Sequence, residues 1–281
     1  MKPPHVLALA FAFAALPAFA ADAPKPIRAL LITGGCCHDY GAQKDLLKSG
    51  IEARANIVVD QMHSDNTTGS PPLPLFGNPD YARGYDVVIH DECAADPRDP
   101  SSFKSVLKPH LDGMPGVNLH CAMHSFRSGD YTQPVARGAD NAQWYEYVGL
   151  QSTGHGPLEP IAITFVDKDH PITRTLDGWT TVNEELYNNV QSLDGKALAK
   201  GRQIVKQSRR QPDGSVTEEA QAVETVVVWT NEFGPKKTRV FSTSLGHTTA
   251  TVADARYLDL VTQGILWATG KVDQPGYAKK K

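Results

Sequence analysis

The sequence predicts an α/β fold, with a mostly parallel sheet flanked by helices and an antiparallel strand extension. Three observations lead to this prediction. Short apolar runs that end at glycine or polar residues are typical of strands buried on both faces. In the first half of the chain these runs alternate with segments whose apolar residues have helical spacing. In the second half the runs look extended and are separated by turn-rich segments.

The first half of the chain contains two strand–helix–strand units. The opening apolar run ends at Gly34-Gly35, and Leu46, Leu47 and Ile51 have helical spacing. Ser101 or Ser102 is expected to cap the second helix. The predicted elements are a strand at 27–33, a helix at 41–54, a strand at 57–60, a long loop at 61–84, a strand at 85–90, a helix at 101–111 and a strand at 116–121.

The second half is expected to be strand-rich. The charged stretch 206–219, with Pro212-Asp213-Gly214, predicts a hairpin turn at the surface. The chain shows no internal repeat and no break in composition, so we expect a single domain at 27–270 followed by a C-terminal tail at 271–281. The other predicted elements are strands at 161–166, 222–230 and 238–244 and a closing helix at 253–269.

Residues 1–20 are predicted to be a secretory signal peptide. They have a short positive start, an apolar run from Val6 to Leu16 and an A-x-A site at Ala18-Phe19-Ala20. The alternative, an N-terminal membrane anchor, is disfavoured because the apolar run is short. We therefore expect cleavage near Ala20-Ala21 and a periplasmic or secreted mature protein.

Charge and hydropathy exclude two classes of partner. The chain has 28 basic and 31 acidic residues without a basic stripe, so a nucleic-acid partner is not expected. After the signal peptide no apolar run approaches the roughly 18 residues that a membrane span requires. The expected partner is a small molecule, and the oligomeric state stays open.

Four cysteines lie near the ends of predicted strands. An exported protein can keep disulfides, and no C-x-x-C motif is present. In a flavodoxin-like strand order the first and third strands are neighbours, as are the third and fourth. Cys93 is therefore expected near both Cys121 and one of Cys36 and Cys37, with Cys37–Cys93 as the favoured bridge. Four unpaired, buried thiols are the alternative.

Histidines also collect after the predicted strands. His38, His120, His124 and His247 each follow an apolar run, and open α/β sheets bind ligands at the carboxyl ends of their strands. We expect these histidines to share one edge of the sheet. By contrast, His90 is expected to be a core residue, and His63 and His110 to lie at the surface.

Several common catalytic motifs are absent. The sequence has no G-x-S-x-G, G-x-G-x-x-G, Walker A or H-E-x-x-H motif. The segment 118–122 instead looks like a strand–turn–helix elbow, with His120 at the turn and Cys121 beside it. A thiol hydrolase that uses Cys121 is a minor alternative.

The order of motifs resembles the trehalose-utilisation, or ThuA-like, family, whose fold is similar to that of class I glutamine amidotransferases. The resemblance spans about residues 28–270. It implies carbohydrate metabolism, with links to disaccharides oxidised to 3-keto sugars. The matching segments are GGCCHDY at 34–40, GVNLHCAMHSF at 116–126, GLQSTGH at 149–155, HPI at 170–172, EELY at 184–187, VFSTSLGH at 240–247 and GILWA at 264–268.

The resemblance also marks a difference from the amidotransferases. Their elbow holds a nucleophilic cysteine, whereas this elbow holds His120, so glutamine hydrolysis is not expected. In the segment Glu184-Glu185, the second residue matches the family's more informative position.

We therefore expect an enzyme that acts on a glycoside or keto-sugar, as a lyase, isomerase or hydrolase. His120 and Glu185 are the acid/base candidates, and burial is expected to raise the pKa of Glu185. His38, His155 and His247 would orient the substrate. The same group could hold a divalent metal. The alternative function is a non-catalytic sugar-binding or scaffold protein that kept the fold.

Overall fold

A computed structural model describes residues 24–279, so the predicted signal peptide and its cleavage site lie outside the described residues. In this part of the chain, nine strands form one mixed sheet with the order β2-β1-β3-β4-β9-β8-β7-β5-β6. Five adjacent strands are parallel, which places their carboxyl ends along one edge. They are β1 (Ile27–Gly35), β2 (Ile57–Ser64), β3 (Val87–Cys93), β4 (Gly116–Leu119) and β9 (Thr238–Thr243).

Four antiparallel strands extend this sheet beyond β9, as the sequence predicted. The sequence patterns predicted parts of the strands at 150–165 and 216–233 but missed those at 180–192 and 196–210, because long exposed stretches hide the alternation of buried and exposed residues. They are β5 (Leu150–Phe165), β6 (Thr180–Ser192), β7 (Lys196–Arg210) and β8 (Val216–Phe233).

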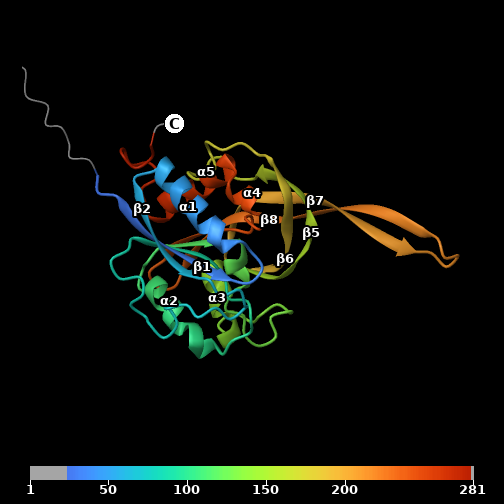
Figure 1. Cartoon of the computed structure of the whole chain (residues 1–281), viewed down its shortest axis with the longest axis horizontal. Coiled ribbons are helices and arrows are strands. Elements are labelled where there is room, and N and C mark those ends of the chain that lie inside the picture. Colours follow the sequence, from blue (N-terminus) through green and yellow to red (C-terminus); the bar gives the residue numbers. More distant parts are fainter. Residues whose placement is uncertain (1–23, 280–281) are drawn as a thin grey trace, which may run out of the picture.

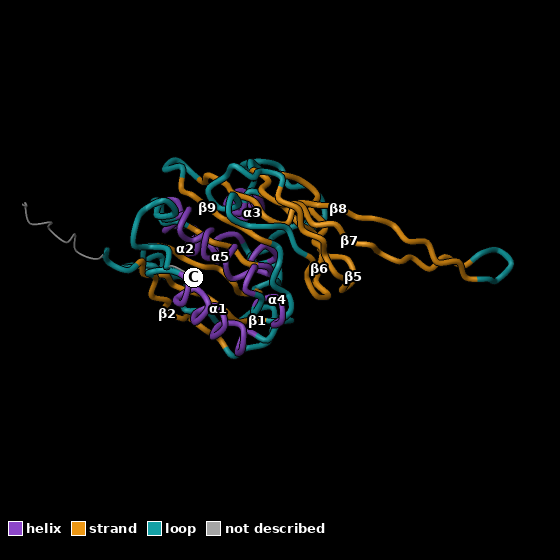
Figure 2. Tube along the Cα trace, turned by 90° about the horizontal axis from the view of Figure 1, so that it is seen from above, coloured by secondary structure: helices purple, strands orange, loops and turns teal. Residues whose placement is uncertain are grey.

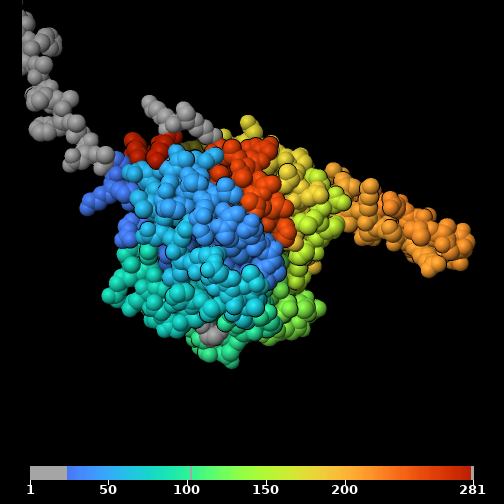
Figure 3. All heavy atoms as spheres, viewed as in Figure 1, coloured from blue at the N-terminus to red at the C-terminus, as the bar shows by residue number. Residues whose placement is uncertain are grey.

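The outer halves of β7 and β8 leave the body of the molecule as a two-stranded arm, coloured orange in Figures 1 and 3. We call residues 206–220 the hairpin arm. The Gln211 N–H donates to the Ser215 carbonyl, and Gly214 has a positive φ of 85° in the turn. This confirms the hairpin predicted at 206–219.

Helices cover both faces of the parallel strands (Figures 1 and 2). On β1, Ala29 and Leu31 contact the core beneath α1 and α5, whereas Leu30 and Ile32 contact the core beneath α2 and α3. This alternation follows from the two-residue period of a strand. The helices are α1 (Tyr40–Arg54), α2 (Lys104–Leu111), α3 (Gln143–Val148), α4 (Thr249–Val252) and α5 (Ala255–Ala268), with 3₁₀ turns η1 (Pro100–Phe103), η2 (His120–His124) and η3 (Asp140–Ala142).

Aspartate side chains cap the N-termini of the two longest helices, α1 and α5. Asp39 accepts a hydrogen bond from the Ala42 N–H at α1, and Asp254 accepts one from the Arg256 N–H at α5. Asp99 accepts from the Ser101 N–H at the start of η1, so the predicted cap at Ser101 or Ser102 was wrong. Proline at position 100 favours the residue before it as the start of the turn.

The segment at 277–279, where the described part of the chain ends, packs against the domain. The Asn56 N–H donates to the Tyr277 carbonyl, and Ala278 forms a β-bridge with Ala55. None of the described helices is long and apolar enough to cross a membrane.

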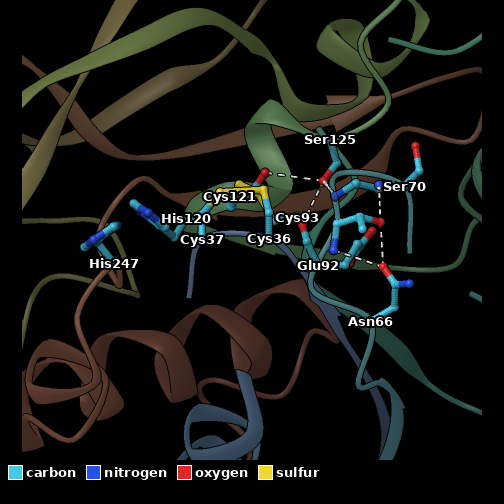
Figure 4. Close-up of a disulfide and its surroundings, with 12 residues drawn as sticks. Cys36, Cys37, Asn66, Ser70, Glu92, Cys93, His120, Cys121, Ser125 and His247 are labelled. Carbon is cyan, nitrogen blue, oxygen red and sulfur yellow. Dashed lines mark hydrogen bonds between the residues drawn. A yellow bond between two sulfur atoms is a disulfide. The ribbon is translucent and has the colours of Figure 1, made fainter. Parts of the chain in front are cut away.

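The cysteines lie together, but their pairing differs from the prediction (Figure 4). Cys93 is close to Cys121, with which it forms a disulfide, and to Cys36, whose Sγ lies 3.6 Å from its own. The second disulfide joins Cys36 and Cys37, so the favoured Cys37–Cys93 bridge was wrong. Cys37 has a left-handed backbone with φ of 81° and is exposed, which turns it away from the end of β3.

Two histidines form a buried network on the face of the parallel strands that α2 and α3 cover. His90 is a core residue as expected, and it hydrogen-bonds Glu92 at 2.8 Å. His110 was expected at the surface, but it is fully buried and contacts His90 at 3.1 Å. The amphipathic face of α2 carries it inward, where its Nδ1 donates to the Met114 carbonyl.

Candidate functional site: a histidine–glutamate cluster

The carboxyl edge of the parallel strands brings three predicted histidines together. His38 follows β1, His120 follows β4 and His247 follows β9. The ring of His38 lies 4.8 Å from those of His120 and His247, measured between centroids. Gly35 ends β1 just before this cluster, and only glycine fits there, since its φ is 105° and an added Cβ would lie 2.2 Å from the Cys93 carbonyl oxygen at the end of β3.

His120 occupies the elbow that the sequence predicted. Its φ of 42° is unusual for a residue other than glycine, and it marks the sharp turn from β4 into η2. Nδ1 lies 2.7 Å from the Ser244 carbonyl oxygen, which can only accept, so Nδ1 carries the proton. Nε2 is therefore the nitrogen that faces the site with a lone pair when the ring is neutral.

Backbone contacts fix His247 beside the elbow. Its N–H donates to Glu184 Oε1 at 2.8 Å, and its carbonyl accepts from Gln43 Nε2 at 3.0 Å. The preceding Gly246 has a φ of 119°, and an added Cβ would lie 2.7 Å from the Tyr257 hydroxyl oxygen. Only glycine fits this turn, which places His247 beside His120, with ring centroids 5.4 Å apart (Figure 4).

Glu185 reaches this edge from β6, at the opposite end of the sheet order. Its Oε2 lies 3.5 Å from His120 Nε2, and its Oε1 lies 3.3 Å from both His155 Nε2 and His247 Nδ1. The β5–β6 pairing has register shifts on both sides of His155. Such bulges bend a strand and increase its twist, and this bending lets the antiparallel extension curl over the carboxyl edge.

The charge environment of Glu185 differs from the expectation. Burial acts to raise the pKa of this carboxyl, but hydrogen bonds and positive charge from His120 and His247 outweigh it. The pKa of Glu185 therefore lies well below its ordinary range. The expected raised pKa was wrong because the sequence could not show how many imidazoles surround the carboxylate. Glu185 is ionised at neutral pH and can accept a proton.

The histidines differ from one another in charge. Burial, followed by the charges of His120 and His247, lowers the pKa of His38 to about 3, so this ring is neutral. The Glu185 carboxylate, whose Oε1 lies 3.3 Å from Nδ1, raises the pKa of His247 above its ordinary value. The cluster thus combines a carboxylate base, a neutral imidazole and a histidine that favours the protonated form.

Three of the histidines could also hold a metal ion. The ligand nitrogens of His38, His120 and His247 lie within 4.8 Å of one another. His38 Nδ1 is buried and has no hydrogen-bond partner among the described residues. The Ser244 carbonyl orients His120 in the way that outer-shell acceptors orient metal-binding imidazoles. Imidazoles beside a carboxylate suit zinc or a similar divalent ion.

Tyr187 and His124 also belong to the site, although the sequence analysis assigned no role to either of them. The Tyr187 hydroxyl forms a hydrogen bond with His120 Nε2 at 3.2 Å, and the Tyr187 ring stacks on His124 with centroids 4.0 Å apart. His124 is fixed in turn by Ser152 Oγ at 2.9 Å. The two-residue period of a strand places Tyr187 on the same face as Glu185, and this signal could have identified it.

These features define a class: an α/β protein whose parallel strands end at a histidine–glutamate cluster, covered by a bent antiparallel extension. Residues 28–268 match the ThuA family, which is described as trehalose utilisation. The chain belongs to this family.

Solved structures agree with this assignment at the level of the fold. A ThuA-like protein from Parabacteroides merdae has 20% identity and a TM-score of 0.59, with 92% of this chain and 93% of that chain covered. A ThuA-like protein from Bacteroides uniformis has 16% identity and a TM-score of 0.55, with 90% and 95% covered. A comparison with curated proteins found no match.

Proposed function

We propose that this protein is an exported enzyme that acts on a glycoside or keto-sugar by proton transfer. The observation that carries the proposal is the contact of the Glu185 carboxylate with three histidines at the carboxyl edge of the sheet. Among the described residues, Glu185 forms no ion pair with lysine or arginine. A structural ion pair would use such a partner, whereas imidazoles suit reversible proton transfer near neutral pH.

We assign a role to each group from the protonation state that its surroundings favour. Glu185 accepts a proton from the carbon beside the substrate's carbonyl. The electron pair of that C–H bond forms a carbon–carbon double bond, and the π pair of the carbonyl moves onto its oxygen. His247, which favours the protonated form, donates a hydrogen bond or a proton to that oxygen. The resulting enolate can expel a glycosidic oxygen, as in a lyase, with the protonated form of His120 giving that oxygen the proton with which it leaves as a hydroxyl. Alternatively, it can take its proton back at another carbon, as in an isomerase. His120 accepts or returns a proton through Nε2, and His38 and His155 orient the sugar.

Export is part of the proposal. It is supported by the pattern of residues 1–20 and by the two disulfides, since disulfides persist mainly in oxidising compartments. The proposed partner is a small sugar, and no nucleic acid or membrane span is proposed for the mature protein. Fractionation of the native host, with mass determination of the mature N-terminus, tests the location. A protein found intact in the cytoplasm would contradict it.

A metal-assisted form of the same reaction is the second candidate. It is favoured by the three convergent imidazoles and by the unpartnered Nδ1 of His38. A divalent ion held there would polarise the substrate's carbonyl oxygen. About one equivalent of metal in unchelated protein would support this form. Substoichiometric metal together with unchanged activity after chelation would exclude it.

The central experiment is a screen of oxidised and unoxidised disaccharides against the mature protein. We expect turnover of at least one oxidised sugar, and a loss of about 10²-fold to 10⁴-fold in Glu185→Gln. Glu159→Gln on the neighbouring β5 is the matched control and should keep full activity. Full activity of Glu185→Gln would contradict the proposal. Tight sugar binding without turnover would instead identify a sugar-binding protein.

A further inference from the structure

Four cysteine side chains meet beside the histidine cluster (Figure 4). The parallel pairing of β1 with β3 sets Gly35 opposite Cys93, and Cys36 is the next residue along the chain. On its other side β3 pairs with β4, and Cys121 lies in the η2 turn that follows β4. The register of the parallel strands therefore brings sulfur atoms from three segments together at the carboxyl edge of the sheet.

The two disulfides differ in their access to solvent. In the first disulfide, Cys37 is exposed and Cys36 is half-buried. In the second, Cys93 and Cys121 are only 1% and 5% exposed, and Tyr40 packs against them. Thiol–disulfide exchange depends on access to the sulfur atom that is attacked. A thiol in solution therefore reaches the outer disulfide much more easily than the inner one.

One contact connects the outer disulfide to the inner one. Cys36 Sγ lies 3.6 Å from Cys93 Sγ, so the two sulfur atoms touch. Once the outer disulfide is opened, the Cys36 sulfur has an inner disulfide sulfur within reach. Cys37 is not placed for this step, because its left-handed backbone, with φ of 81°, turns its side chain outward. The two adjacent cysteines thus differ in role, with one facing solvent and the other facing the buried disulfide.

We infer that the four cysteines form a thiol–disulfide relay, which passes an electron pair from an external dithiol to the buried Cys93–Cys121 disulfide. This activity is additional to the proton transfer proposed at Glu185. The co-reactant is a dithiol because its second thiol can release it from the mixed disulfide that forms with the protein.

The relay has three steps. A thiolate of the dithiol attacks Cys37 Sγ, which forms a mixed disulfide and expels Cys36 as a thiolate. The second thiol of the reagent closes the reagent's own disulfide and expels Cys37, which takes up a proton. Cys36 then attacks Cys93 Sγ, so a Cys36–Cys93 disulfide forms while Cys121 leaves and is protonated. Overall, the dithiol gives up two electrons and two protons, and the protein exchanges two disulfides for one disulfide and two thiols.

The relay ends beside the proposed catalytic groups. A ring nitrogen of His38 and the sulfur atoms of Cys93 and Cys121 lie within 4.8 Å of one another. Cys121 also directly follows His120 in the η2 turn. The last step therefore releases a thiol at the elbow and detaches η2 from the end of β3.

Partial reduction followed by peptide mapping tests the relay. Protein is treated briefly with dithiothreitol at about pH 8, where a useful fraction of thiol is ionised, then alkylated and digested with trypsin. The cysteines fall in three separate peptides, 29–44, 84–98 and 105–127. We expect a Cys36–Cys93 cross-link between the first two peptides, with Cys37 and Cys121 alkylated. If this cross-link appears at no stage of reduction, the relay is overturned.

Two single variants form a matched pair, since each leaves one free thiol. In Cys37→Ser the free thiol of Cys36 touches Cys93, so we expect the Cys36–Cys93 cross-link and alkylated Cys121 without added reductant. In Cys36→Ser the free thiol of Cys37 faces solvent, and the Cys93–Cys121 disulfide should stay intact. Equal exchange in both variants, or none in Cys37→Ser, would contradict the relay.

A double variant tests the entry point. Replacing both Cys36 and Cys37 with serine removes the outer disulfide, and the inner one should then be reduced about tenfold or more slowly than in wild type. Equal rates would show that dithiothreitol attacks the buried disulfide directly, which would also overturn the relay. These measurements do not use turnover, so their outcome is independent of the proposed function.

Discussion

Oε2 of Glu185 lies 3.5 Å from Nε2 of His120, although four strands separate β6 from β4 in the sheet. A flat sheet would hold these groups far apart, because neighbouring strands are about 4.8 Å apart. The contact forms because bulges around His155 bend the antiparallel extension back over the parallel strands. The proposed site therefore depends on the curvature of the sheet.

Two substitutions at His120 can distinguish its role in catalysis from its role in the fold of the elbow. Asparagine tolerates a positive φ, so His120→Asn should keep the fold and lose about 10²-fold to 10⁴-fold in turnover, since it removes Nε2. His120→Val places a β-branched side chain at a φ of 42° and should cost a further 1–3 kcal/mol or so in the free energy of unfolding. Urea unfolding and turnover of both variants measure the difference. Equal stability of the two variants would contradict a strained elbow.

The pair Glu185–His247 predicts a pH-dependent coupling. The pKa of Glu185 is lowered, so its contribution to stability is present above its unfolded value of 4.5 and is lost as the pH falls through the folded pKa. The pKa of His247 is raised, so its contribution is complete below 6.5 and is lost as the pH rises through the folded pKa. A double-mutant cycle with Glu185→Gln and His247→Asn should give a coupling of about 0.5–3 kcal/mol near pH 5.5, which shrinks by pH 9. A coupling that grows toward pH 9 would be the opposite of this prediction.

The two disulfides should differ in their effect on stability. Cys93 and Cys121 are separated by 28 positions, so replacing both with alanine releases a long loop in the unfolded chain and should cost about 3–4 kcal/mol. Cys36 and Cys37 are adjacent and close no loop, so their double replacement should cost much less. Denaturant unfolding without reductant compares the two variants. Similar losses for both would refute this account.

The hairpin arm should be dispensable for folding. Lys206 pairs with Ala220, so residues 207–219 can be replaced by Asn-Gly, which forms a two-residue hairpin turn. The removed side chains are exposed apart from the half-buried Gln211, and surface changes of this kind usually alter stability by about 0.5 kcal/mol or less. We expect an unchanged melting temperature, oligomeric state and turnover. A change of oligomeric state would show that the arm contacts a partner.

Local patterns in the sequence were enough to predict the parallel half of the fold. The buried strand at 27–33, the helix at 41–54 and the elbow at His120 follow from hydrophobic period and glycine placement, which act over a few residues. The flavodoxin-like order that we expected for the parallel strands is confirmed, with β1 beside β3 and β3 beside β4. The same order brought Cys93 near Cys121 and near Cys36.

Contacts between distant segments decided the rest. The Cys93–Cys121 pairing depended on the left-handed turn at Cys37, and the low pKa of Glu185 depended on imidazoles contributed by two other segments, at His120 and His247. A two-residue period shows which side chains share a face of β6, but it does not show where a bent strand places that face. The sequence alone determined which chemical groups this protein has at its strand ends. Only the tertiary structure, through the curl of the sheet, decided that Glu185 would meet the histidines.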